Sequence, residues 1–337
     1  MPIHKATIKD IAKKVGVSVS TVSRALNDSS NISAETKAKI SQVALELNYI
    51  PDRTAVSLKD GISKTLGIVV PYNYLLSYQL YRGINKILCE KGWACFLMTT
   101  EDNPKQEKHC LTILENLGVS GVIMFAKDAQ SNLQKIQSMI ESGIHFSFII
   151  GAKNLSNITY VSIDDENNMF FMVERLIENG YHKLAYINMP PYISNAHSHF
   201  MGFKAATEKH HLYNPDLIFH SENMEPQNCQ QVADLIIKKL KDIDIVVAYN
   251  DIIAGEVLKH LLQKGVRVPE DVAIAGFGGS PLSALFKPSI TTVEIPIEEI
   301  CKNCANLMIQ KLTDPQYEDR IVTLPAKFVE RESTMRH

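Results

Sequence analysis

The sequence lacks any long apolar run. No segment approaches the roughly 18 consecutive apolar residues of a membrane-spanning helix, and the N-terminus has no apolar core of a secretory signal. Hydrophobic residues make up 45% and charged residues 21% of the 337 residues, which is the balance of a globular protein with a large core. We therefore expect no membrane association and a cytoplasmic location.

The sequence also has little clustering of metal ligands. Of the six cysteines, only Cys301 and Cys304 lie close together. A CxxC pair can serve redox chemistry or half of a metal site, but this one lies within the helical pattern PIEEICKNCANLMIQKL, with no second CxxC or His pair nearby. We expect both side chains to pack within a helix, with the redox or metal role as the alternative, and we predict no metal site.

Motifs of the common α/β enzymes are missing too. No GxGxxG opens a helix after the first expected strand, and neither GxSxG nor a P-loop occurs. We expect no catalytic residues, no cofactor and no enzymatic activity, and keep an α/β enzyme as a less favoured alternative.

Positive charge is concentrated at the N-terminus. Residues 1–60 contain nine Lys or Arg and six Asp or Glu, a net charge of +3, whereas the whole chain has −2, which leaves −5 for the remainder. A basic segment ahead of an acidic body suits a polyanionic partner such as DNA.

The first 26 residues predict two short helices joined by a tight turn. Thr7 can cap a helix whose apolar positions recur every three or four residues, with Asp10 placed to complete a capping box, and Gly16 ends it. Ser18 can cap a second helix that runs to about Leu26. This is the pattern of a helix-turn-helix, and a third helical stretch follows to residue 48.

The residues left facing outward on the second helix suit a DNA major groove. Arg24 can donate two hydrogen bonds to a guanine, Val19 can contact a thymine methyl and Ser20 can bond several base edges, so we predict that these three read bases. Other small polar residues lie near helix starts, where backbone N–H groups also bind phosphate, although each could serve only as a cap. We predict phosphate contacts for Thr7, Ser18, Thr21, Ser23, Asn27, Asn31 and Ser33.

The segments TIKDIAKKVGVSVSTVSRALN and ELNYIP resemble the DNA-binding domain of the lactose-repressor family of bacterial transcription regulators. The resemblance implies a hinge helix in which Leu58, beside Ala55, enters the minor groove at the operator centre, which kinks the duplex. Asp52 departs from the family, which usually has Asn there, and its charge is unfavourable next to phosphate.

From Thr65 onward, short apolar runs alternate with helical segments, and the same alternation occurs twice. We therefore predict an α/β body of two doubly wound parallel-sheet subdomains. The segments GVSGVI, GYHKLAYI, YNDIIAGEVL and GVRVPEDVAIAGF extend the family resemblance, which implies a body like periplasmic sugar-binding proteins. The expected divisions are a helix-turn-helix domain at 1–50, a hinge helix and linker at 51–63, and an effector-binding and dimerisation domain at 64–335. Within this last domain, one subdomain comprises 64–164 and 294–322, and the other comprises 165–293 and 323–335.

Ligands of open α/β sheets lie beyond the carboxyl ends of the strands. We accordingly predict an effector site from residues that follow the expected strands, namely Tyr74, Tyr78, Asp165, Asn188, His199, Asn223, Asn250 and Gly278. The family generally has Arg at the place of His199 and Asp at the place of Gly278, and both hold sugar hydroxyls. Their loss predicts a changed effector, such as a modified or more aromatic-stacked ligand. In the alternative interpretation, His199 is a solvated helix residue and the tyrosines only pack at the edge of the cleft. Asp251 is expected to cap the helix that follows.

The expected function is a DNA-binding transcriptional regulator, by family default a repressor of a catabolic or uptake operon. Its expected partners are a pseudo-palindromic operator, a sugar or sugar-like effector and a second copy of itself, because a symmetric dimer matches a symmetric site. The chain ends within seven residues of Glu330, too short for a tetramerising heptad tail, so a homodimer is expected. An effector pocket that has diverged to another metabolite or a protein co-regulator is the first alternative. A sugar-binding transport protein is less favoured, because it needs export.

Overall fold

The computed structural model describes residues 6–26, 29–49, 63–71, 75–101, 103–125, 131–149, 158–191, 193 and 195–335. The chain divides into two units, residues 1–63 and 64–337, which we call the head and the body. Among the described residues, no helix has the length and apolar character needed to cross a membrane.

The described part of the head contains three helices, α1 (Ile8–Val15), α2 (Val19–Leu26) and α3 (Ala34–Glu46). Gly16 ends α1 in the left-handed conformation at φ 80°, which glycine adopts without steric cost. The Ser33 hydroxyl caps α3 by accepting the Thr36 N–H at 3.3 Å. The helices meet over a small core of Ile11, Ala12, Val22, Ala25, Ile40 and Val43, so the three-helix prediction is confirmed.

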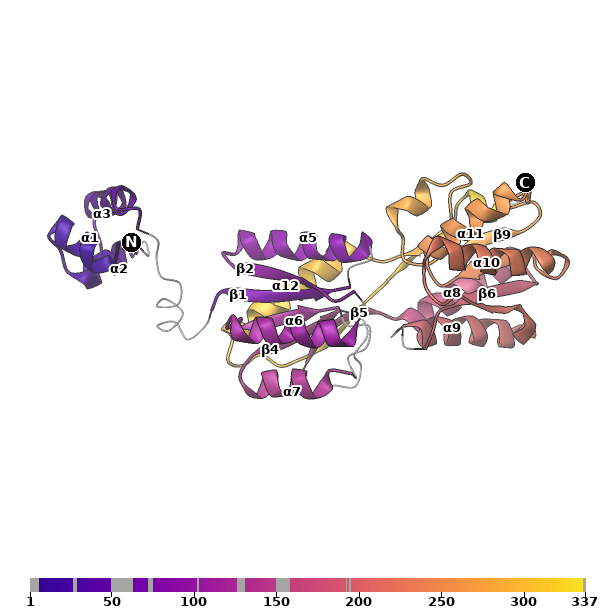
Figure 1. Ribbon diagram of the computed structural model, residues 1–337, viewed down its shortest axis with the longest axis horizontal. Helices are drawn as coiled ribbons and strands as arrows, with labels where there is room; N and C mark the ends of the chain where they lie inside the picture. Colours follow the sequence, from indigo (N-terminus) through magenta and orange to yellow (C-terminus); the bar gives the residue numbers. More distant parts are fainter. Residues whose placement is uncertain are drawn as a thin grey trace. The chain divides into compact units, whose positions relative to one another are not determined.

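The first half of the body is built on a six-stranded parallel sheet in the order β11-β5-β4-β3-β1-β2 (Figure 1). Strands β1, β3, β4 and β5 are almost entirely buried, because helices cover both faces of a parallel sheet. The strands are β1 (Thr65–Val70), β2 (Ala94–Thr99), β3 (Gly121–Met124), β4 (His145–Ile149), β5 (Thr159–Ile163) and β11 (Ile321–Leu324). The helices are α5 (Leu75–Glu90), α6 (Pro104–Asn116), α7 (Leu133–Glu141) and α12 (Ile297–Thr313).

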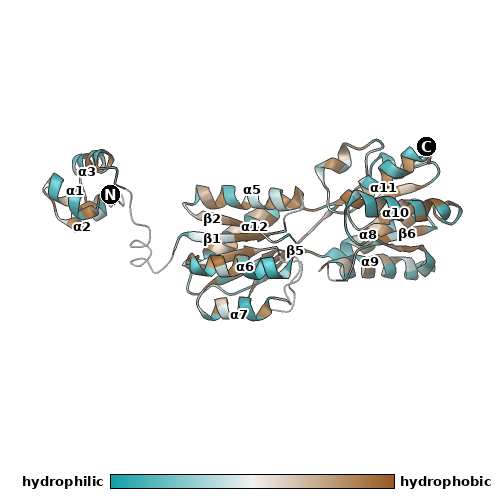
Figure 2. Ribbon diagram, viewed as in Figure 1, coloured by the Kyte–Doolittle hydropathy of each residue, from teal (hydrophilic) through white to brown (hydrophobic). Residues whose placement is uncertain are grey.

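The second half has a four-stranded parallel sheet in the order β7-β6-β8-β9. Its strands are β6 (Leu184–Asn188), β7 (Ile218–His220), β8 (Ile245–Ala248) and β9 (Ala273–Ala275), and its helices are α8 (Asp165–Glu178), α9 (Ala196–Lys209), α10 (Pro226–Lys238) and α11 (Asp251–Gln263). Figure 2 shows hydrophobic strands inside both halves and mixed helix surfaces around them. The predicted fold class is therefore confirmed.

The chain crosses between the halves more than once. Helix α12 packs against α5 and β4 of the first half, and β11 joins that sheet beside β5. A separate antiparallel pair forms from β10 (Thr292–Glu294) and β12 (Lys327–Val329). The expected subdomain limits at 293/294 and 322/323 thus fall inside β10 and β11, because strand pairing extends past the points where the sequence pattern changes.

Cysteine packing in α12 follows the sequence prediction. Cys301 and Cys304 are buried with exposed fractions of 2% and 0%. Cys301 lies against Gly83 of α5, where an added Cβ would collide with its sulfur, so the two helices approach closely. Among the described residues no group of metal-ligating side chains is assembled.

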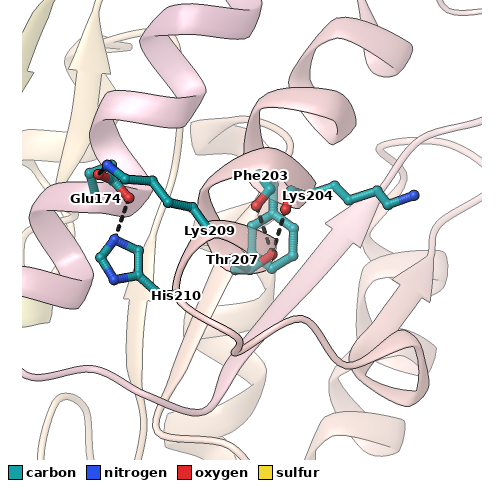
Figure 3. A network of polar contacts seen from close by, with 6 residues as sticks. All are labelled: Glu174, Phe203, Lys204, Thr207, Lys209 and His210. Carbon is teal, nitrogen blue, oxygen red and sulfur yellow. Dashed lines mark hydrogen bonds and ion pairs between the residues drawn. The ribbon is translucent and has the colours of Figure 1, made fainter.

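Helices α8 and α9 are fixed to each other near both ends. A side chain at Gly202 of α9 would collide with the Glu166 carbonyl of α8, so glycine permits the close approach. At the far end, Glu174 of α8 accepts hydrogen bonds from Lys209 and, at 2.6 Å, from His210 (Figure 3). Nearby, the Thr207 hydroxyl lies within hydrogen-bond reach of the Phe203 and Lys204 carbonyls. This packing fixes where α9 begins and hence where His199 lies.

Candidate functional site

Helix α2 presents the predicted base-reading residues to solvent. Val19 is 41% exposed, and Ser20 and Arg24 are exposed, whereas Val22 and Ala25 are buried in the head core. The 3.6-residue period places the two sets on different faces. One face of α2 therefore holds the head together and leaves the other free for a DNA groove.

The start of α2 carries a cluster of hydroxyl groups. The Ser18 hydroxyl accepts the Thr21 N–H at 3.1 Å and lies 2.8 Å from the hydroxyls of both Ser20 and Thr21. These groups surround the positive end of the helix dipole, where an anion is stabilised. The arrangement suits a phosphate contact.

The remaining predicted DNA residues have several positions. Thr7 precedes α1 and donates from its N–H and its hydroxyl to the Asp10 carboxylate at 2.8 and 2.7 Å, while Ser33 caps α3. Asn31 is exposed and Ser23 is half-buried. Asn27 and the expected hinge residues Ala55 and Leu58 lie outside the described residues.

The body contains a cleft whose empty space, counted together with the solvent at its open side, is about 850 Å³. It lies where strands of the two sheets end, and both halves contribute, with α5 on one side and α8, α9 and α11 on the other. Its lining comprises Leu75, Leu76, Gln79, Phe125, Asp165, Asn195, His199, Tyr249, Asn250, Asp251, Ile252, Phe277, Gly278, Ser280, Ile295 and Ile297.

His199 is held in the wall of this cleft by a carboxylate and two aromatic rings. Its Nε2 lies 3.2 Å from Asp165 Oδ1, and its side chain is 2% exposed. The ring centroids of Phe277 and Tyr249 lie 4.2 and 5.0 Å from that of His199. When Nε2 donates to the carboxylate, Nδ1 becomes an acceptor, and it is buried without a partner among the described residues. The alternative of a solvated His199 is wrong, because α8 packs over the start of α9.

Asp251 supports the glycine-rich loop that forms another part of the wall. Its carboxylate is 2% exposed and accepts the Ser280 N–H at 2.6 Å. A side chain at Gly276 would collide with this carboxylate, and Gly278 has φ 121°, a conformation that other residues rarely adopt. The family's Asp at position 278 would be strained in this loop, so its absence has a backbone reason here.

The residue that caps α11 is Asn250, and not Asp251 as expected from the sequence. The Asn250 side chain accepts the Ile253 N–H at 2.9 Å and is thus the cap of α11, while its amide nitrogen lies 2.9 Å from Met224 Sδ. Asp251 is the first residue inside the helix and turns to the loop. The expectation that Asp251 caps α11 is wrong, because the chain enters the helix one residue earlier.

Four predicted effector residues, Asp165, His199, Asn250 and Gly278, come together in the cleft lining. Tyr78, Asn188 and Asn223 are described but are not part of it. Tyr78 is 59% exposed, Asn188 accepts the N–H of Met189 at 2.9 Å, and Asn223 accepts the Glu225 N–H at 2.9 Å. Tyr74 lies outside the described residues.

Several lining residues were not singled out from the sequence. Tyr249, whose hydroxyl donates to Asn195 Oδ1 at 2.5 Å, directly precedes the predicted Asn250, and Phe277 directly precedes Gly278. Their positions directly after β8 and β9 are the sequence feature from which both could have been predicted as site residues. Gln79 directly follows the predicted Tyr78 on α5, but which of the two side chains faces the cleft depends on helix packing, and Asn195 before α9 has no comparable signal.

The fold and these two sites define a class: DNA-binding transcription regulators that carry a periplasmic-binding-protein-like body. A model of bacterial regulatory proteins of the lacI family matches residues 7–52, and one of the periplasmic binding protein-like domain matches 173–334. The chain thus combines a DNA-binding domain of the lacI family with a periplasmic-binding-protein-like domain.

Relatives match over nearly the whole chain. The HTH-type transcriptional repressor PurR of Aliivibrio salmonicida (strain LFI1238) is 27% identical, with 97% of this chain and 98% of that protein covered. The ribose operon repressor of Halalkalibacterium halodurans is 29% identical, with 97% of each chain covered. These relatives are transcriptional regulators rather than enzymes.

Solved structures show the same fold. The lac repressor dimer bound to operator and the anti-inducer ONPF aligns with a TM-score of 0.87 at 20% identity, covering 98% of this chain and 100% of that chain. The transcriptional regulator CelR in complex with cellobiose aligns with a TM-score of 0.73 at 24% identity, with the same two coverages.

The buried Asp251 predicts a pH dependence of stability. Burial raises the pKa of this carboxyl from 3.8 to about 6, even though hydrogen bonds from Thr292 and Ser280 oppose the shift. Because the folded state holds the proton more tightly than the unfolded state, stability contributed by this group is present below pH 4 and lost as the pH rises to about 6. Denaturant unfolding should show the wild-type chain losing on the order of 3 kcal/mol across this range relative to Asp251→Asn. If the free energy of unfolding had the same pH dependence in both proteins, the raised pKa of Asp251 would be contradicted.

Proposed function

We propose that the head reads one half-site of a pseudo-palindromic operator, with Val19, Ser20 and Arg24 on base edges. The observation that carries this proposal is the solvent-facing surface of α2, which combines a guanidinium, a hydroxyl and a small apolar group on a helix whose opposite face is buried. Phosphate contacts are assigned to Thr7, Ser18, Thr21, Ser23, Asn27, Asn31 and Ser33, and the minor-groove contact to Ala55 and Leu58.

A second copy of the chain supplies the other half-site. Strand β2 is at the edge of its sheet, and its middle residues Phe96 and Leu97 are 40% and 41% exposed. An exposed apolar edge strand is unfavourable in a monomer and is relieved by a partner. We assign the β2 edge to the homodimer interface, by analogy with the lac repressor, whose structure is described as a dimer bound to operator.

The cleft is the proposed effector site, with a sugar or sugar-like metabolite as the first ligand class. Aromatic faces from Tyr249 and Phe277 suit the apolar face of such a ligand, and the partnerless His199 Nδ1 suits one of its O–H or N–H groups. A similar regulator is described in complex with cellobiose. The absence of Arg at position 199 and of Asp at position 278 supports a ligand that differs from the simple sugars.

Effector binding would control DNA binding through the angle between the subdomains. The head is proposed to comprise 1–50, the hinge and linker 51–63, and the body 64–335, divided near β10 and β11. A ligand between the subdomains would change the spacing of the two hinges of a dimer. Coupling of this kind is typically about 1–3 kcal/mol and reciprocal, so operator DNA would change effector affinity by the same factor.

We propose that the chain represses a catabolic or uptake operon and has no enzymatic activity. Ser280 shares the cleft with the His199–Asp165 pair, but its hydroxyl accepts the Leu282 N–H at 3.3 Å, and no Ser–His hydrogen bond occurs among the described residues. A nucleophile activated by a base is thus not assembled. Operator binding would place the protein in the cytoplasm.

Replacement of Arg24 tests the DNA-reading assignment. On DNA from upstream of its own gene, Arg24→Ala should weaken binding by about 1–3 kcal/mol, roughly 5- to 150-fold, through loss of a bidentate base contact. The control Ser41→Ala changes an exposed side chain of α3 and should keep wild-type affinity. Gel shifts at fixed salt give the comparison, and equal affinities of Arg24→Ala and wild type contradict the assignment.

Replacement of Leu97 tests the dimer. A charge in Leu97→Glu would be buried against its symmetry mate, so sedimentation should show a monomer at concentrations where the wild type is a dimer. Phe171→Glu is the matched control, since Phe171 is 62% exposed on α8 and lies outside β2. A dimeric Leu97→Glu would exclude β2 from the interface.

Calorimetric titration with sugars, sugar phosphates and nucleosides tests the effector site. For a compound that binds the wild type, His199→Ala should lower affinity at least about fivefold, as expected for a lost hydrogen bond of about 1 kcal/mol. Asn223→Ala, outside the cleft lining, should bind normally. Unchanged binding by His199→Ala would contradict the site, and unchanged operator affinity with the compound bound would contradict the coupling.

A further inference from the structure

Cys89 and Cys95, which belong to different secondary-structure elements, lie close together at the end of α5. Cys89 lies in the last turn of α5, and Cys95 is the second residue of β2. Both thiols donate to the same atom, Asn85 Oδ1, at 3.4 Å from Cys89 and 2.9 Å from Cys95. Two sulfur atoms bound to one oxygen are near neighbours, so Asn85 brings the thiols together.

The two thiols have different surroundings. Cys89 is exposed and Cys95 is partly buried. Burial, together with a smaller contribution from the neighbouring Cys89, raises the pKa of Cys95 to about 11. Burial also raises the pKa of the Tyr81 hydroxyl, with smaller contributions from Cys95 and Cys89. Cys95 is therefore a protonated thiol at neutral pH, and Cys89 is the one that solvent-borne reagents reach.

We propose that Cys89 and Cys95 form a reversible disulfide when the protein meets a hydroperoxide. The Cys89 thiol loses its proton, and the thiolate attacks the distal peroxide oxygen; the O–O bond breaks, and the leaving oxygen takes up that proton and departs as alcohol or water, which gives a sulfenic acid at Cys89. The Cys95 sulfur then attacks the Cys89 sulfur, its proton leaves with the hydroxyl group as water, and the S–S bond forms. Two thiols lose two electrons and the hydroperoxide gains them; a cellular thiol reverses the reaction.

A disulfide between Cys89 and Cys95 would affect the region around β2. Cys95 directly precedes Phe96, and the disulfide would tie α5 to the strand that carries the proposed dimer surface. The regulatory part of this inference rests on the proposed function, whereas the disulfide itself does not. Cytosolic disulfides are usually transient and redox-sensing, which suits a regulator.

Cys301 and Cys304 provide a reference pair inside the same molecule. They are three residues apart on α12, but their exposed fractions are only 2% and 0%. Burial raises the pKa of Cys301 to about 11 and that of Cys304 well above its usual value. Because solvent-borne oxidants cannot reach Cys301 and Cys304, both should stay reduced under conditions that oxidise Cys89.

Trypsin digestion tests the proposal on the full chain, which is oxidised in the folded state, then denatured and alkylated so that every remaining thiol reacts. Cleavage after Lys86, Lys91 and Lys105 separates Cys89 and Cys95 into two peptides, residues 87–91 and 92–105, which stay joined only through a disulfide. After one equivalent of hydrogen peroxide, mass spectrometry should find these peptides linked, Cys301 and Cys304 alkylated, and the link lost after dithiothreitol. Asn85→Ala should form the link several-fold more slowly, and Cys89→Ser should leave Cys95 alkylated.

Three results would overturn the proposal: peptide 87–91 joined to a second copy of itself, Cys89 oxidised to sulfinic acid with Cys95 still free, or Cys95 oxidised equally fast in Cys89→Ser. None of these readouts requires DNA or effector. A confirmed disulfide with unchanged dimerisation would therefore separate the thiol chemistry from its proposed regulatory role.

Discussion

The body depends on one constraint, that parallel strands covered on both faces accept almost only apolar side chains. The central strands β1, β3, β6 and β8 are buried nearly throughout, and their backbone groups are paired along the sheets. Polar side chains are thereby displaced to the carboxyl ends of the strands, where helices begin. Asp165 follows β5, Asn250 follows β8 and Gly278 follows β9, so the cleft lies at an edge where polar side chains are compatible with the fold.

Burial of polar groups at this edge costs free energy, and specific neighbours hold these groups in place. His199 is retained by Asp165 and by the rings of Tyr249 and Phe277, while Asp251 is retained by the backbone of the glycine-rich loop. Among the described residues, His199 Nδ1 and Asp251 Oδ1 are buried here without a hydrogen-bond partner, and leaving such atoms unpaired costs free energy. The proposed effector site assigns the unused acceptor on His199 to a hydrogen-bond donor of the ligand.

How far the sequence predicts the structure differs between local and long-range features. The bounds of α1 and α2 follow from apolar spacing, Gly16 and the caps, all of which act within a few residues. In the cleft, Asp165, His199, Asn250 and Gly278 were predictable because they follow strands or occupy family positions. Tyr78 and Asn223 were predicted on the same grounds but turn elsewhere, since the direction of a side chain depends on neighbours that are distant in the sequence.

By itself, the sequence determined that this is a helix-turn-helix regulator with a twofold α/β body, because periodicity, caps and motifs are local properties of the chain. Tertiary structure alone decided that His199 is buried, that Asn250 rather than Asp251 caps α11, and that Gly278 has a backbone in which the family's aspartate would be strained. It also decided that Cys89 and Cys95 share Asn85. Each of these depends on how separate elements pack, as α8 does against α9 and α5 against β2, and packing is set by the whole fold rather than by neighbouring residues.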